Sequence, residues 1–283
     1  MNLPSIKPYP NTAQSFGITG FSLLVMLILL PLMFSLNDSI GEAPSMLIYY
    51  CIALLIPIII FHFLKKKYEK EVSYQLLPKS KFLFFALIVI TIAIQNAILT
   101  PITSFIPVPE SIKDIFYKFM LQSKNPYGFI TIAIAAPILE EWLFRGIILD
   151  GLLKRYSAKK AILLSSFLFG ILHLNPWQFV GAFILGIFIG YIYFHTKNLG
   201  YCILIHFSNN FVATIALFYF DESQVLQDNL YESYGGATNF FLVFSVSLIL
   251  IIALLFYFNK HFKSKSESYQ FKNFNYPFNK ISN

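Results

Sequence analysis

A short polar stretch interrupts one of the most apolar parts of the chain. Residues 139–146, LEEWLFRG, stand between GFITIAIAAPI and IILDGLL. A charged side chain removed from water costs on the order of several kcal/mol unless it is paired. Glu141 and Arg145 are four residues apart, so on a helix they share a face and can form an ion pair. Glu140 is rotated roughly 100° away from Glu141 and has no such local partner. The stretch therefore predicts one ion pair and one carboxylate without a local partner. That carboxylate is either available for chemistry or protonated and hydrogen-bonded in a purely structural contact.

Two further apolar runs carry polar side chains. FGILH ends at His173, with Phe169 one turn earlier on the same helical face. HFSNN places His206 and Asn210 four residues apart, again on one face. Each has a structural alternative, because a histidine at a helix end is often interfacial and a His–Asn pair can join two helices by hydrogen bonds.

The depth of these groups along their helices links them. At about 1.5 Å per residue, Glu140, His173 and His206 each lie roughly 14 to 20 Å from the basic residues that end their helices. Three helices therefore bring polar groups to a similar depth, where they can share one polar cavity.

These residue types suit hydrolysis by water. A buried carboxylate such as Glu140 can act as the general base toward a water molecule. His206 and Asn210 can donate hydrogen bonds to the oxygen on which charge develops in a tetrahedral intermediate. Zinc is the alternative, held by Glu140, His173 and His206. No HExxH sequence favours it, and no nucleophilic serine or cysteine stands out.

The amino-acid composition indicates the class of protein in which these groups lie. Of the 283 residues, 57% are hydrophobic and only 12% are charged. That charged fraction is about half the usual value for a soluble domain and is typical of an integral membrane protein. The net charge of +7 is explained by basic loops on one side of a membrane and requires no nucleic-acid partner. Cys51 and Cys202 lie in apolar runs without metal-ligand spacing.

The predicted fold is all-α, a polytopic membrane protein of about eight transmembrane helices with both termini cytoplasmic. Alternating the loops between two sides places most of the 21 Lys and Arg residues on the side of the termini, as the positive-inside rule requires. Only LNPW divides the fifth and sixth spans, and Pro176 is a suitable helix start there. The predicted spans lie near residues 16–36, 45–64, 82–100, 127–150, 160–175, 177–195, 199–220 and 238–259.

Three regions follow from this pattern. Residues 1–126 hold the N-terminal transmembrane helices and, at 109–124, an amphipathic helix at the outer surface. Residues 127–220 form a helical core that carries every polar motif. Residues 221–283 contain an acidic outer loop, the last transmembrane helix and a basic cytoplasmic tail.

The three motifs together resemble those of a known family. EEWLFR reads as EExxxR, FGILH as FxxxH and HFSNN as HxxxN, in this order on successive helices. The segment 127–218 thereby resembles the CPBP family of intramembrane proteases. That family includes the type II CaaX prenyl endopeptidases and bacterial relatives linked to bacteriocin immunity and lysostaphin resistance.

The resemblance implies an intramembrane peptidase that uses a glutamate to activate water. By this resemblance Glu140 is the base, and His173 helps to bind and orient the water. His206 and Asn210 are the pair that stabilises the oxyanion.

The resemblance assigns Glu141 and Arg145 to a supporting pair that shapes the site. It leaves the question of a catalytic metal open, and we expect a mechanism without one, with zinc as the alternative. The expected partners are a membrane protein or peptide substrate and the lipid bilayer. A composition rich in Phe, Lys, Asn and Ile suits a bacterial protein, so the expected location is the bacterial cell (inner) membrane.

Two other classes use similar residues. A proton-coupled transporter also relays protons through buried Glu and His side chains, but it predicts inverted repeats, and the sequence has none. A non-catalytic membrane binding protein is the second alternative, although every motif residue is present here.

Overall fold

The computed structural model describes residues 8–69, 72–107, 109, 121–219 and 230–272. These residues form helices and no β-strand, which confirms the all-α prediction. Most of the surface helix predicted at 109–124 lies outside the described residues, as do much of the acidic loop and the end of the basic tail.

Six helices are long and apolar enough to cross a membrane. They coincide with six of the eight predicted spans, which confirms a polytopic membrane protein but not the number eight. Whether both termini are cytoplasmic stays a prediction. The six candidate spans are Thr12–Ile40 (α1), Glu42–Tyr68 (α2), Lys81–Ser104 (α3, η1 and α4), Pro176–Thr196 (α10), Leu199–Phe218 (the main part of α11) and Ala237–Phe262 (the first part of α13).

The predicted fifth span is shorter than expected. It corresponds to α9, Ala158–Ile171, whose 14 residues cover roughly 21 Å against about 30 Å of hydrocarbon. The helix ends because the backbone turns at Leu174, which has a φ of 57°. Asn175 then caps α10 by accepting a hydrogen bond from the Gln178 N–H, and α10 begins at Pro176 as predicted.

The predicted fourth span is a continuous series of short helical elements from Pro126 to Leu153. Two π-helical turns interrupt its α-helical hydrogen bonding on either side of the glutamates. Such turns change which backbone groups are paired and occur often at functional sites. The elements are α6 (Pro126–Phe129), η2 (Ile130–Ala135), α7 (Ala136–Glu141), η3 (Trp142–Leu149) and α8 (Asp150–Leu153).

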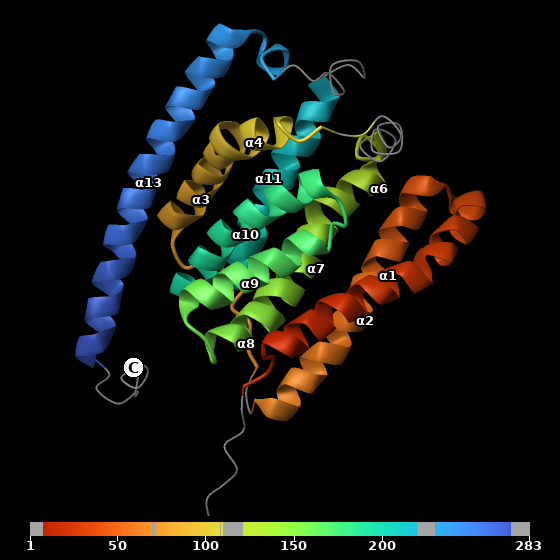
Figure 1. The fold of residues 1–283 in the computed structure, drawn as a ribbon, viewed down its shortest axis with the longest axis horizontal. Coiled ribbons are helices and arrows are strands. Elements are labelled where there is room, and N and C mark those ends of the chain that lie inside the picture. Colours follow the sequence, from red (N-terminus) through yellow and green to blue (C-terminus); the bar gives the residue numbers. More distant parts are fainter. Residues whose placement is uncertain (1–7, 70–71, 108, 110–120, 220–229, 273–283) are drawn as a thin grey trace, which may run out of the picture.

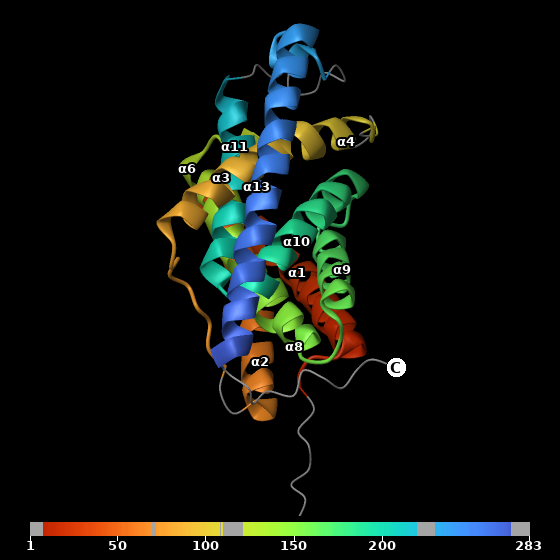
Figure 2. The same ribbon diagram turned by 90° about the vertical axis from the view of Figure 1, so that its left-hand side faces the viewer.

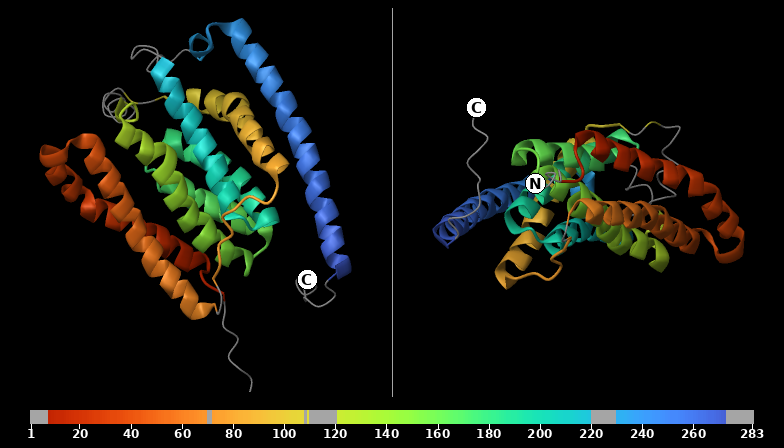
Figure 3. Two further views of the ribbon diagram at one scale, coloured as in Figure 1. Left: turned by 180° about the vertical axis from the view of Figure 1, so that it is seen from behind. Right: turned by 90° about the horizontal axis from the view of Figure 1, so that it is seen from below.

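The polar motifs lie in the middle of the helix assembly. In Figure 1 the antiparallel pair α1 and α2 forms one flank and α13 forms the other, and the side view in Figure 2 agrees with this arrangement. Seen from behind in Figure 3, α11 lies between the α6–α8 segment and α3, and it packs against both α7 and α3. The motif-bearing helices are therefore shielded by neighbours on both sides.

A buried charged network joins the ends of α2, α8 and α10. The ammonium group of Lys65 is fully buried and lies 2.7 Å from Oδ2 of Asp150. Lys65 also donates to the carbonyl oxygen of Gly146, at 2.9 Å, within η3. Lys154 and the Tyr193 hydroxyl also bind Asp150. This network fixes α2 against the helix that carries the two glutamates.

Candidate active site

Glu141 is the centre of a fully buried charged cluster. Nη1 of Arg145 donates to Oε1 of Glu141 at 3.0 Å, which is the ion pair expected from their spacing. Nδ1 of His206 lies 2.9 Å from the same oxygen. A carboxylate oxygen only accepts, so Nδ1 of His206 carries the hydrogen of this bond. Two helices, α7 and α11, are thus joined through one carboxylate oxygen.

Arg145 reaches a third helix through a glycine. Its Nη2 donates to the carbonyl oxygen of Gly186 in α10, at 3.2 Å. A Cβ on Gly186 would lie 3.2 Å from Nη2 and 3.1 Å from Cβ of Ser166. Glycine therefore permits the close approach of the guanidinium to the α10 backbone.

Phe169 packs between the cationic and imidazole groups. The guanidinium carbon of Arg145 lies 4.6 Å from the centre of the Phe169 ring, a cation–π distance. The rings of His206 and His173 meet Phe169 edge-on, with centroid distances of 5.4 Å and 5.3 Å. The phenylalanine of FxxxH therefore contacts residues of all three motifs.

Glu140 is held differently from Glu141. Its side chain is buried, and Oε1 accepts a hydrogen bond from the hydroxyl of Tyr50 in α2. Oε2 has no hydrogen-bond partner among the described residues and lies 4.0 Å from Nε2 of His206. One oxygen of Glu140 is thus fixed, and the other faces the free nitrogen of the imidazole.

The amide of Asn210 lies one turn beyond His206 on α11. Its Nδ2 donates to the carbonyl oxygen of Ile132 at 2.9 Å. In η2 the N–H of Ala136 binds the carbonyl of Thr131, five residues earlier, as in a π-helix. By the same step the carbonyl of Ile132 would bind the N–H of residue 137, but that residue is a proline and has no N–H. The proline thus leaves an acceptor for Asn210, whose second N–H remains for another acceptor.

His173 is the predicted site residue that is least integrated into the cluster. Its Nδ1 lies 3.1 Å from the carbonyl oxygen of Phe169, one turn back on α9. In the part of the chain that the structure describes, its ring forms no hydrogen bond with either glutamate. The structure therefore brings four of the six residues together, Glu140, Glu141, Arg145 and His206. It connects His173 to them through Phe169, and Asn210 lies one helical turn from His206.

Tyr50 was not found by sequence reasoning. Its only sequence signal is a hydroxyl within an apolar helix, and its partner Glu140 is 90 residues away. The adjacent Tyr49 carries the same signal but donates to the carbonyl oxygen of Met26. No spacing rule distinguishes these two tyrosines.

The zinc alternative requires Glu140, His173 and His206 as the ligands. Among the described residues, no group of three or more His, Cys, Asp or Glu side chains is placed to hold a metal ion. Nδ1 of His206 faces Glu141 and Nδ1 of His173 faces the carbonyl of Phe169, so Nε2 is the nitrogen that each ring could offer to a metal.

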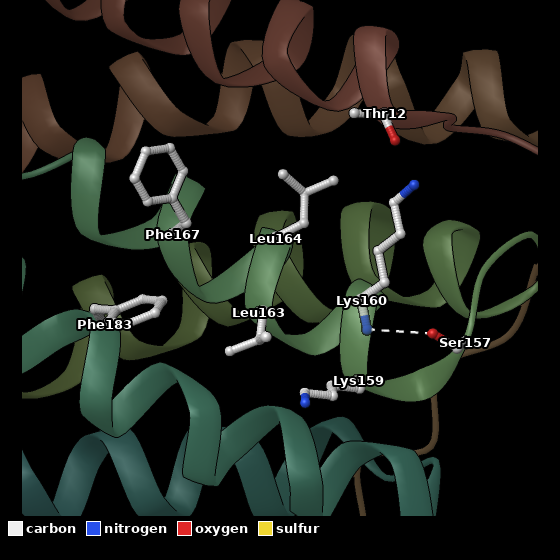
Figure 4. Close-up of a pocket in the computed structure, with 8 residues that line it drawn as sticks. All are labelled: Thr12, Ser157, Lys159, Lys160, Leu163, Leu164, Phe167 and Phe183. Atoms are coloured by element: carbon white, nitrogen blue, oxygen red, sulfur yellow. Dashed lines mark hydrogen bonds between the residues drawn. The ribbon is translucent and has the colours of Figure 1, made fainter.

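A groove elsewhere on the molecule is separate from this cluster. It is an open groove of about 620 Å³ that runs along α9 beside α1 and α10 (Figure 4). None of the six predicted site residues lines it. Leucine and phenylalanine side chains form its walls, and two lysines with two hydroxyl groups stand at one end.

Comparisons with known proteins identify part of the chain. Residues 122–212 match the family model described as type II CAAX prenyl endopeptidase Rce1-like. The match contains all three motifs and confirms the resemblance that they predicted. Comparisons with curated proteins and with solved structures found no match.

Proposed function

We propose that this integral membrane protein is an intramembrane endopeptidase in which Glu140 activates water to hydrolyse a peptide bond. The match of residues 122–212 to a protease family supports peptidase activity. The observation that carries the mechanism is the placement of Oε2 of Glu140, which is buried, unpartnered among the described residues and 4.0 Å from Nε2 of His206.

The contacts of the two glutamates favour Glu140 as the base. Each has one oxygen without a hydrogen-bond partner among the described residues. Glu141, however, is ion-paired with Arg145, and its protonation would leave a fully buried guanidinium without its counter-ion. Protonation of Glu140 breaks no ion pair with arginine or lysine. Glu140 can therefore accept a proton at lower cost.

Polar groups more than about 3.5 Å apart can be bridged by a water molecule. The proposed water lies between Oε2 of Glu140 and Nε2 of His206, which are 4.0 Å apart. Glu140 takes one proton from this water as its oxygen attacks the peptide carbonyl carbon. The tetrahedral intermediate then collapses, the C–N bond breaks, and Glu140 returns the proton to the leaving amine. The products are a new carboxyl terminus and a new amino terminus.

His206 and Asn210 are the proposed donors to the oxyanion. Asn210 has its second Nδ2–H for this purpose. Nε2 of His206 donates only when the ring is an imidazolium, because Nδ1–H is already directed to Glu141.

His173 is proposed to bind the water or the substrate through Nε2. Because Nδ1 faces a carbonyl oxygen, it carries the hydrogen, and Nε2 of the neutral ring is an acceptor. No step in this mechanism requires zinc, and removal of metal from the purified protein tests that part of the proposal.

The proposed substrate is a membrane protein or peptide that reaches the site from the bilayer, and the proposed location is the bacterial cell (inner) membrane. The site lies among helices long and apolar enough to span a membrane, so a substrate must present its peptide bond at membrane depth.

The test compares the N- and C-termini of membrane proteins in cells that make the wild-type chain, Glu140→Gln or Glu42→Gln. Glu42 is an exposed carboxylate at the start of α2 and serves as the matched control. New termini should occur with the wild type and Glu42→Gln and disappear with Glu140→Gln. Identical termini in all three cultures, with the proteins folded and abundant, would instead favour a transport or binding role.

A further inference from the structure

The hydrogen bond between Tyr50 and Glu140 brings α2 into the candidate site. Tyr50 lies well outside residues 122–212, the segment that matches the protease family. Its hydroxyl donates to Oε1 of Glu140 from a helix that packs against α7. Helix α2 therefore contributes a side chain to the candidate site as well as covering the motif-bearing core.

The contact decides which oxygen of Glu140 is available. A carboxylate has two chemically equivalent oxygens until a donor occupies one of them. Tyr50 occupies Oε1, and Oε2 then faces Nε2 of His206 at 4.0 Å. Without the donor, the carboxylate of Glu140 can rotate about its last side-chain bond and turn away from Nε2 of His206, because such terminal torsions are broad.

We propose that Tyr50 is a positioning residue that fixes Oε1 of Glu140 and so directs Oε2 toward the water and His206. This inference rests on the proposed function, since it assigns Glu140 the role of base. The fixed positions of α2 and α7 maintain the geometry, and the Lys65–Asp150 ion pair joins α2 to the same polar helix.

The neighbouring tyrosine provides a matched control. Tyr49 and Tyr50 lie on the same helix, and each hydroxyl makes one hydrogen bond. Tyr49 donates to the backbone of α1 at 2.9 Å, whereas Tyr50 donates to Glu140. Removal of either hydroxyl by substitution with phenylalanine removes one buried bond, but only one of the two touches the proposed base.

The kinetic test uses full-length protein in lipid vesicles with the substrate identified from new termini. Tyr50→Phe should lower kcat about tenfold to a hundredfold, the range for loss of a hydrogen bond to a charged group, and leave KM within about twofold. Tyr49→Phe should leave both parameters close to wild type. An unchanged kcat in Tyr50→Phe, or an equal loss in both variants, would overturn the positioning role.

A second readout separates this inference from the proposed function. The infrared difference between wild type and Glu140→Gln identifies the carboxylate band of Glu140. That band should shift in Tyr50→Phe and remain in Tyr49→Phe, whether or not any peptide is cleaved. A shifted band in a protein that cleaves nothing would overturn the peptidase function and leave the contact established. An unshifted band would show that Tyr50 does not hold Glu140.

The groove along α9 carries a second, independent inference. Its walls are apolar, formed by Leu163, Leu164, Phe167 and Phe183, and its end holds Lys159 and Lys160 (Figure 4). Both lysines are exposed. Phe167 lies seven residues beyond Lys160, or roughly 10 Å along the helix. The groove therefore changes from cationic to apolar over the distance that separates a lipid headgroup from its acyl chain.

We infer that this groove binds one anionic glycerophospholipid. The phosphate lies beside Lys160, whose ammonium group points toward Thr12 and lies 4.5 Å from the centre of the Tyr156 ring (Figure 4). Lys159 points away from Thr12 and adds a second positive charge at the same end of the groove. One acyl chain runs past Leu163 and Phe167. The lysines should favour an anionic headgroup over a zwitterionic one. Each lysine near the headgroup raises the affinity for an anionic lipid about fivefold.

Lipid retention measured by native mass spectrometry tests this site, with phosphatidylglycerol and phosphatidylcholine supplied in equal amounts. In the double variant Lys159→Gln/Lys160→Gln, the ratio of retained phosphatidylglycerol to phosphatidylcholine should be at least about tenfold lower than in wild type. Lys66→Gln/Lys67→Gln removes two exposed lysines of α2 that do not line the groove and should retain the preference. Leu163→Trp should fill the groove and release the lipid although both lysines remain. Equal retention of the two lipids, equal effects of both lysine pairs, or a bound peptide in place of lipid would overturn the inference.

Discussion

Oε1 of Glu141 and Nδ1 of His206 lie 2.9 Å apart, although the two residues are 65 positions apart in the sequence. This bond joins the EExxxR and HxxxN motifs directly and orients the imidazole so that Nε2 faces Glu140. Because Arg145 binds the same oxygen, the position of His206 depends on a charged pair that is fully buried.

The two glutamates should differ in what their replacement does to stability. Glu141→Gln removes the counter-ion of the buried Arg145, and breaking a buried pair costs about 3–5 kcal/mol. Glu140→Gln keeps an oxygen that accepts from Tyr50 and should cost about 1 kcal/mol or less. Thermal unfolding in one detergent should give the larger decrease in Tm for Glu141→Gln. Equal decreases would contradict the assignment of separate roles.

Asn210→Ala should lower kcat about 10²- to 10³-fold, the usual effect of the loss of one oxyanion donor. Asn96 is the matched control, because its Nδ2 also donates to a backbone carbonyl, that of Ile92, at 2.8 Å, and its helix carries none of the six predicted site residues. Asn96→Ala should lower kcat by much less. Steady-state rates of both variants check this prediction, and similar losses would indicate that Asn210 acts only through helix packing.

Gly186→Ala should disturb the site from a distance. The added methyl group would meet Nη2 of Arg145 and Cβ of Ser166 at distances shorter than ordinary contacts. Overpacking of this kind costs about 1–3 kcal/mol, and it should displace the guanidinium from Glu141. We expect a lower Tm and lower activity than in wild type. Gly17→Ala, where a methyl group meets nothing within 4 Å, is the control. If Gly186→Ala had the Tm and activity of wild type, the prediction would be wrong, and α10 would be able to move away from Arg145.

Treatment with a tight chelator should leave activity unchanged, since no step of the proposed mechanism passes through a metal. The rate of cleavage before and after chelation, followed by addition of zinc, measures this directly. Loss of activity that only zinc restores would replace the glutamate mechanism with metal-assisted hydrolysis.

The sequence predicted the parts of the site that depend on local geometry. The pairing of Glu141 with Arg145 follows from a four-residue spacing on a helix, and the start of α10 follows from Pro176. The membrane spans follow from long apolar runs, because backbone groups in lipid must be paired within helices or closed barrels.

The remaining features depend on contacts between distant residues. The bond from Tyr50 to Glu140 requires knowledge of how α2 packs on α7, and nothing in the sequence around Tyr50 distinguishes it from Tyr49. The π-helical turns beside the glutamates and the early end of α9 arise from local backbone geometry that hydrophobic periodicity does not report. The bond from Nδ1 of His173 to a carbonyl of its own helix is another contact that the depth argument does not report.

The most direct test of the central claim is hydrolysis by the purified protein in lipid vesicles, with the identified substrate and water labelled with ¹⁸O. The account predicts one ¹⁸O atom in each new carboxyl terminus and a rate at least about 10²-fold lower for Glu140→Gln, the smallest effect expected of a general base. Glu140→Gln protein that is folded and cleaves at the wild-type rate would contradict it.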